Sequence, residues 1–89
     1  MDNELIEAVS FLKASKHRRE IMNALGNNIA TPSEISLKTD IRLNHVSTML
    51  KELKLKRLVV CLNENNKRGR LYQLTEMGKL AINVIRQST

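Results

Sequence analysis

One segment of the chain places polar and basic side chains opposite an apolar stripe. Between residues 43 and 56, the positions i, i+3, i+4 and i+7 of one helix face are apolar: Val46, Met49, Leu50 and Leu53. The opposite face and the residue before the segment carry hydrogen-bonding groups: Arg42, Asn44, His45, Ser47, Thr48 and Lys51. Asn and Arg can bond base edges in two places, Ser and Thr can bond a base or a phosphate, and an α-helix fits the major groove of DNA. The pattern favours contact with nucleic acid; the alternative is the ordinary polar surface of a core helix.

A second basic cluster follows in a loop between two short predicted strands. Residues 58–62 are apolar and partly β-branched, residues 63–69 are rich in turn formers, and residues 70–75 alternate polar and apolar. This pattern predicts a hairpin with Lys67, Arg68 and Arg70 near its tip. Such a tip can lie along a phosphate backbone or enter a minor groove, where Arg is favoured. Alternatively, the charges only protect the hairpin edge from aggregation.

A tightly specified short helix precedes the basic segment. Thr31 can cap the helix with its hydroxyl, Glu34 can reach back from the third position, and Pro32 lies where no N–H is needed. We expect this helix to run from Thr31 to about residue 38, followed by a turn over residues 39–41. A capped helix, a turn, a basic helix and a hairpin, in this order, predict a winged helix-turn-helix. The fold class is then mainly α with a small β-hairpin wing, which is an α+β arrangement.

Two helices are predicted before this unit. Residues 3–14 form the first, with Ile6 at the edge of its apolar stripe, which consists of Leu5, Ala8, Val9 and Leu12. Ser15 is placed to cap a second helix over about 16–25, which Gly26 ends. The apolar face of this second helix consists of Ile21, Met22, Ala24 and Leu25. The alternative is a single helix bent near Ser15.

Three further pieces complete the expected core. Residues 29–30 are expected to form a short extended piece that pairs with the hairpin. Ile35 and Ile41 should point inward from the short helix and the turn after it. A last helix should begin at Thr75 or Glu76 and continue to about residue 87, with the following apolar side: Met77, Leu80, Ala81, Val84 and Ile85.

The positive charge is concentrated in one third of the chain. The 89 residues carry a net charge of +6, and residues 42–70 alone hold eight Lys or Arg against two Glu. A basic region confined to one part of a chain is typical of nucleic-acid contact. The alternative is a solvated surface that keeps the protein soluble.

Length and composition exclude several classes of protein. Residues 1–89 suffice for one domain with one modest core. No apolar run approaches a membrane span, and Asp2, Glu4 and Glu7 give the wrong charge for a signal peptide. Cys61 is the only cysteine and is expected to pack in a strand, so no disulfide or cysteine pair for zinc is available. The sequence shows no nucleotide-binding loop, nucleophile motif or paired carboxylates. We therefore expect a cytoplasmic, nucleoid-associated protein that is not an enzyme and needs no cofactor or metal.

Two runs of the sequence resemble a known family. They are ATPSEISLKTDIRLNHVSTMLKELKLKRLVVCLN and KRGRLYQLTEMGK, which lie within residues 30–79. The chain resembles winged-helix transcription regulators of the ArsR/MarR type, and most closely their small archaeal members. The resemblance implies that residues 43–56 form the recognition helix, that residues 64–70 form the wing, and that Ser33 contacts a phosphate.

The chain departs from this family pattern at three points. Many relatives have Gly at the end of the recognition helix, where this chain has Arg57, and a small polar N-cap where this chain has Arg42. A residue other than Gly at such a helix end can shift the turn. The cysteine pair of metal-sensing ArsR proteins is absent, and His17, His45 and Cys61 lack ligand spacing.

The expected partners are double-stranded DNA and a second copy of the chain. The helices at 3–14 and 76–87 are predicted to form a homodimer interface, the alternative being that both only close the monomer core. The apolar residues expected there exceed what the core needs: Leu5, Val9 and Leu12 in the first helix, and Leu80, Val84 and Ile85 in the last. No small-molecule effector is evident. The competing functions are a winged helix that docks on protein in the transcription or replication machinery, and a non-specific coat on chromatin or double-stranded RNA. A docking module would carry aromatic or Met anchors on residues 42–70.

Overall fold

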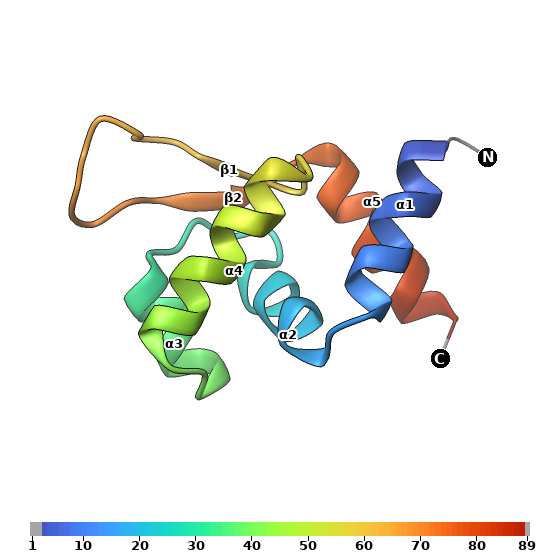
Figure 1. The fold of residues 1–89 in the computed structure, drawn as a ribbon, viewed down its shortest axis with the longest axis horizontal. Coiled ribbons are helices and arrows are strands. Elements are labelled where there is room, and N and C mark those ends of the chain that lie inside the picture. The colour runs from blue at the N-terminus through green and yellow to red at the C-terminus, as the bar shows by residue number, and fades with distance from the viewer. Residues whose placement is uncertain (1–2, 89) are drawn as a thin grey trace.

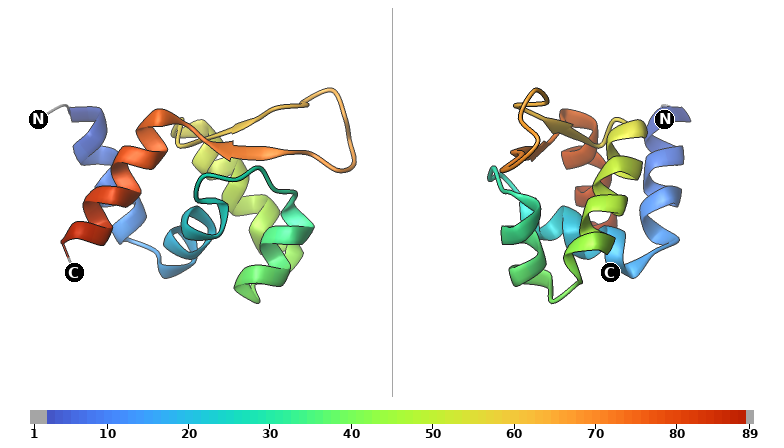
Figure 2. Two further views of the ribbon diagram at one scale, coloured as in Figure 1. Left: turned by 180° about the vertical axis from the view of Figure 1, so that it is seen from behind. Right: turned by 60° about the vertical axis from the view of Figure 1, so that its left-hand side comes forward.

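Five helices and a two-stranded sheet make up the computed structural model, which describes residues 3–88 and leaves Asp2 outside. The elements are α1 (Asn3–Lys13), α2 (Lys16–Leu25), α3 (Pro32–Thr39), α4 (Leu43–Leu55), β1 (Val59–Cys61), β2 (Tyr72–Leu74) and α5 (Glu76–Gln87). The hairpin extends from one end of the molecule, and α1 and α5 lie side by side at the other end (Figures 1 and 2). No helix within residues 3–88 is long and apolar enough to cross a membrane.

Three helices begin at the predicted capping residues. Ser15 accepts a hydrogen bond from the Arg18 N–H and separates α2 from α1, so the single bent helix is not formed. Thr31 Oγ1 accepts from the Glu34 N–H at 3.2 Å, and Glu34 Oε1 accepts from the Thr31 N–H at 2.9 Å. This is the reciprocal capping box, and it fixes the start of α3. Thr75 Oγ1 caps α5 by accepting a single hydrogen bond from the Gly78 N–H.

Two consecutive arginines of α2 hold the carbonyl end of α1. Arg18 Nη1 donates to the Phe11 carbonyl at 2.9 Å, and Arg19 Nη1 donates to the Lys13 and Leu12 carbonyls at 2.7 and 3.0 Å. The Arg18 guanidinium also lies 3.7 Å from the centre of the Phe11 ring, a cation–π contact, and 3.9 Å from Glu52 of α4. These contacts satisfy carbonyls that a helix end leaves unpaired, and they join α1, α2 and α4.

The hairpin is antiparallel, and a third short piece of chain extends it. Cys61 pairs with Tyr72 and Val59 with Leu74. Ala30 bonds Tyr72 in both directions at 3.1 and 2.9 Å, which confirms the predicted pairing of residues 29–30. Both strands are shorter than predicted, because beyond the Leu62 N–H bond to Leu71 the two arms separate into the wing loop. Cys61 is buried in the strand, as predicted.

The core confirms the predicted stripes of α1, α2 and α4 but corrects that of α5. Ile35 and Ile41 are buried as expected, while Ala24 and Met49 are only partly buried. In α5 the sequence missed Ile82, which is buried, while Leu80 on the predicted apolar side is 53% exposed. The stripe is rotated because α5 packs against α1 on one side and against α2 and β2 on another. Met77 and Val84 are therefore half-buried.

Two backbone features fix the joints around α4 and α5. Arg57 has a φ of 61°, in the left-handed region, and follows the end of α4, where the family resemblance led us to expect Gly. The turn is kept despite the side chain, because the Leu58 N–H still donates to the Leu53 carbonyl at 2.9 Å. Gly78 packs so closely against the backbone before β1 that a Cβ there would overlap the Leu58 carbonyl oxygen.

Candidate nucleic-acid interface

The start of α3, one face of α4 and the wing meet around an open cleft of about 400 Å³. Five of the residues predicted to contact DNA line it: Ser33, Ser47, Lys51, Lys67 and Arg70. Ser33 lies in the first turn of α3, which the capping box and Pro32 orient. Ser47 and Lys51 are one turn apart on α4 and lie outside its buried stripe of Val46, Leu50 and Leu53. The cleft thus joins residues that are up to 37 positions apart, from Ser33 to Arg70, on one surface.

The other five predicted residues surround this cleft without lining it. Arg42, Asn44, His45 and Thr48 are exposed on or just before the first turns of α4, and Arg68 is exposed on the wing. Thr48 Oγ1 donates to the Asn44 carbonyl at 3.0 Å, so its proton is used within the helix. Its lone pairs remain able to accept a hydrogen bond.

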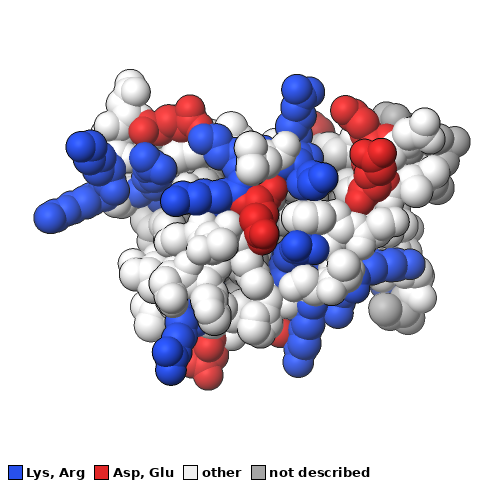
Figure 3. Space-filling view, viewed as in Figure 1, with Lys and Arg blue, Asp and Glu red and all other residues white. Residues whose placement is uncertain are grey.

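The cations of this surface are free of acidic partners. Within residues 3–88, no ion pair or hydrogen bond is made by the side chains of Arg42, Lys51, Lys67 and Arg68. The ion pairs that do form use other cations, such as Lys16, Lys54 and Lys79. Figure 3 shows basic side chains gathered over the wing and along α4, with acidic groups between them as well as at the far end. The surface is therefore positively charged and uncompensated.

An ion pair and one asparagine orient the wing relative to α4. Lys54 of α4 pairs with Glu64 of the wing, and this hydrogen bond lowers the pKa of Glu64 and raises that of Lys54. Asn63 Oδ1 accepts from the Leu71 N–H at 2.7 Å, and Asn63 Nδ2 donates to the Gly69 carbonyl at 3.1 Å. These bonds bridge the two arms where strand pairing has ended.

Arg70 also holds the wing loop together, a role that the sequence did not predict. Its Nε donates to the Asn66 carbonyl at 2.9 Å, so the guanidinium lies back along the wing loop. The side chain still lines the cleft, and its remaining N–H groups can bind an anion.

Leu43 is among the cleft residues that the sequence did not assign to DNA contact. It is the first residue of α4, lines the cleft beside Ser47, and is 48% exposed. In the sequence it lies three positions before Val46 and therefore reads as a continuation of the buried stripe. Only its position at the solvent end of the helix distinguishes it from a core residue.

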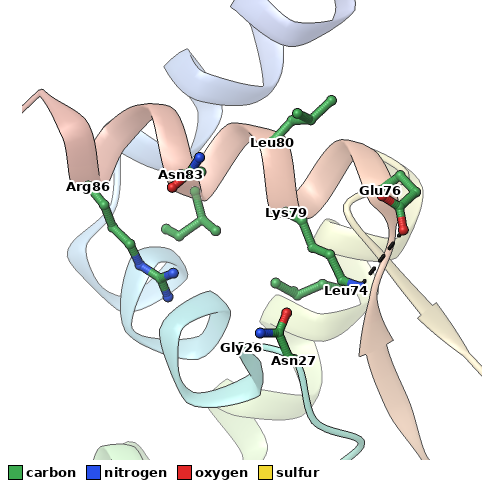
Figure 4. Close-up of a pocket in the computed structure, with 9 residues that line it drawn as sticks. Gly26, Asn27, Leu74, Glu76, Lys79, Leu80, Asn83 and Arg86 are labelled. Atoms are coloured by element: carbon green, nitrogen blue, oxygen red, sulfur yellow. Dashed lines mark ion pairs between the residues drawn. The ribbon is translucent and has the colours of Figure 1, made fainter.

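A hollow away from this surface has its charged groups paired. It measures about 310 Å³ and lies between the end of α2, β2 and α5 (Figure 4). There Lys79 is paired with Glu76 at 3.8 Å, and Arg86 donates to Asn23 Oδ1 at 2.7 and 3.0 Å. Within the described part of the chain, no three His, Cys, Asp or Glu side chains gather closely enough to hold a metal ion.

Several solved structures share this arrangement. A MarR family transcription regulator superposes with a TM-score of 0.78 at 21% identity, over 94% of this chain and 57% of its own. A cysteine-to-serine mutant of MarR from E. coli, solved with operator DNA, has a TM-score of 0.73 at 28% identity, over 97% and 63%. TubR from Bacillus thuringiensis serovar israelensis, bound to 24 bp of tubC, has a TM-score of 0.81 at 10% identity, over 96% and 95%.

These likenesses show that the fold is a MarR-like winged helix-turn-helix, as predicted. At their identities, the first and third structures show the fold alone. The chain spans 57% and 63% of the length of the two MarR structures. No model of a known protein family matches the sequence, and no curated protein matches it either.

Proposed function

We propose that this chain is a sequence-specific regulator of transcription that binds double-stranded DNA. One observation carries the proposal: a polar helix face and a basic wing, distant in sequence, share one surface whose cations Arg42, Lys51, Lys67 and Arg68 lack acidic partners. MarR and TubR, which share the fold, were solved with DNA. None of the three structures is described as an enzyme, which supports the expectation of a non-catalytic role.

The proposed roles follow from where each group lies. Helix α4 enters the major groove, and its early residues Asn44, His45 and Thr48 reach base edges. Lys51 and Ser33 contact phosphates beside the cleft, and Arg42 does so at the start of the helix. Lys67, Arg68 and Arg70 follow the backbone or the minor groove from the wing. Ser47 can bond either a base or a phosphate.

The charge predicts how binding responds to salt. If about five phosphates are neutralised, the logarithm of the binding constant should fall with the logarithm of salt concentration with a slope of roughly −4 to −5. The test is selection of bound fragments from genomic DNA, followed by footprinting and titration at several salt concentrations. A defined motif with this slope is the expected result. Salt-dependent binding without any motif would instead identify a non-specific coat, and no binding at low salt would identify a docking module.

The proposal includes a homodimer built through α1 and α5. These helices pack against each other in one chain, so Leu12 and Ile85, which the sequence suggested for the interface, are already buried. The outer sides of both helices remain apolar: Leu5, Val9, Met77 and Val84 are half-buried, and Ile6 and Leu80 are 47% and 53% exposed. Pairing these sides across a two-fold axis would present two recognition helices to half-sites about one DNA turn apart.

Sedimentation at tens of micromolar tests the dimer. A Leu80→Glu variant should sediment as a monomer, while Leu37→Glu, at a more exposed leucine of α3, should remain a dimer. Circular dichroism confirms that both variants are folded. Wild-type protein that sediments as a monomer, or a footprint over one non-palindromic half-site, would contradict the dimer.

Four narrower expectations accompany this function and stay predictions. They are a single domain over residues 1–89, a cytoplasmic and nucleoid-associated location, an archaeal affinity within the family, and regulation without a small-molecule effector.

A further inference from the structure

We propose that Leu43 reads a thymine methyl group in the preferred DNA site, an inference that rests on the proposed function and adds a residue to it. Leu43 begins α4 and lines the cleft together with Ser47 and Lys51, which follow it at i+4 and i+8 on the same helix. It therefore lies on the surface assigned to DNA, one helical turn before Ser47, which can bond a base.

The folding of the monomer does not account for this leucine. It does not belong to the buried core, and it is absent from the partly buried side chains that pack against that core. Its 48% exposed side chain shares the cleft with Pro32 and Tyr72 and with four hydrophilic residues: Ser33, Ser47, Lys51 and Lys67. Because exposed apolar area is costly in water, this side chain gains most from a partner that covers it.

Duplex DNA offers one apolar group in the major groove, the C5 methyl of thymine. The polar residues that share the cleft with Leu43 are suited to the polar base edges and the phosphates, and an aliphatic side chain is suited to the methyl group. Half of the Leu43 surface is already covered by protein, which restricts its rotamers before DNA arrives. The contact would therefore lose little conformational entropy and would select thymine at one position of each half-site.

The experiment removes the methyl group from the DNA and the side chain from the protein. The preferred duplex is first selected from random sequences with the wild-type protein. Each thymine is then replaced singly by deoxyuridine, which lacks only the methyl group. For the wild-type protein, one such replacement per half-site should weaken binding about fourfold, the factor that burial of one methyl group is worth.

The Leu43→Ala variant should bind the thymine and deoxyuridine duplexes equally well. The matched control is Leu55→Ala, at the other end of α4, where an 83% exposed leucine lies outside the cleft. This control should keep the full preference for thymine. Both variants should fold, because Ala is a better helix former than Leu and neither side chain is buried.

The possible failures are distinguishable. If no motif is selected, the proposed function fails and the inference fails with it. If a motif is selected but no deoxyuridine replacement weakens binding, the function stands and the inference is wrong. The inference is also wrong if the thymine preference survives in Leu43→Ala, or if this variant weakens every duplex equally, since the side chain would then contact the sugar-phosphate backbone.

Discussion

Replacing Gly78 with Ala should destabilise the protein, even though Ala is the better helix former. A Cβ at this position would overlap the Leu58 carbonyl oxygen and lie 3.1 Å from the carbonyl carbon, whereas ordinary contacts begin at 3.4 Å. The oxygen cannot easily move, because the Leu58 N–H is bonded to the Leu53 carbonyl at 2.9 Å and the oxygen itself accepts from the Thr75 N–H at 3.1 Å. Either α5 or the chain entering β1 must therefore shift.

Two opposing contributions set the size of the effect. Overpacking of a core costs about 1–3 kcal/mol, and the backbone partner places this site at the upper end. Exchange of Gly for Ala in a helix recovers about 1 kcal/mol. The net loss should be about 2 kcal/mol, which for a chain of this length lowers the melting temperature by roughly 8–16 °C.

Thermal and urea unfolding followed by circular dichroism measure this loss. The control is Asn83→Ala on the exposed side of α5, which has no close neighbour to displace and should gain up to about 0.5 kcal/mol from helix propensity. If Gly78→Ala melts at or above the wild-type temperature, the close packing of α5 on the chain before β1 is wrong.

Three further predictions concern the ends of α4 and the wing. Arg57→Gly should raise the free energy of unfolding by about 1 kcal/mol in urea titrations, because Gly accepts the positive φ without strain. Asn44→Ala should weaken binding to the preferred site by about 1–3 kcal/mol with little change on random DNA. Arg68→Gln should instead weaken binding to both kinds of DNA and reduce the salt slope by about one. A competition assay in which Asn44→Ala leaves the specific-to-random ratio unchanged would contradict the role of α4. Because its bond to Lys54 holds the pKa of Glu64 below 4.5, the contribution of this pair is present above pH 4.5 and lost as the pH falls below it. Amide chemical shifts of the wing should therefore be constant from about pH 5 to 8 and change only in more acidic solution.

The parts of the fold that depend on local chemistry could be predicted from the sequence. The helices begin at Ser15, Thr31 and Thr75 because a capping side chain bonds a backbone N–H only three positions away. The stripe of α4 is equally local, since one helix face must be buried whatever lies opposite. These signals also placed the polar face of α4 and the basic wing in the right order along the chain.

The parts that depend on neighbours distant in sequence could not be predicted. Which side of α5 is buried depends on where α1 and β2 press against it, so the burial of Ile82 was missed. The pairing of Lys54 with Glu64 depends on how far the wing bends back toward α4. Leu43 continues an apolar stripe in the sequence, and only the three-dimensional arrangement shows that the core ends before it.

The contacts of Arg18 fix the orientation of α1, part of the proposed dimer interface, relative to α4, the proposed recognition helix, within a single subunit. The guanidinium binds the Phe11 ring and carbonyl of α1 and lies 3.9 Å from Glu52 of α4, while its Nε is buried without a partner within residues 3–88. A tilt of α1 would separate the largely desolvated Arg18 guanidinium from these groups. We therefore expect α1 and α4 to move together as a rigid unit. In a dimer joined through α1 and α5, the distance between the two recognition helices would then be preset before DNA arrives. Operators with altered half-site spacing would be rejected by mechanical stiffness, without any change in the bases that are read.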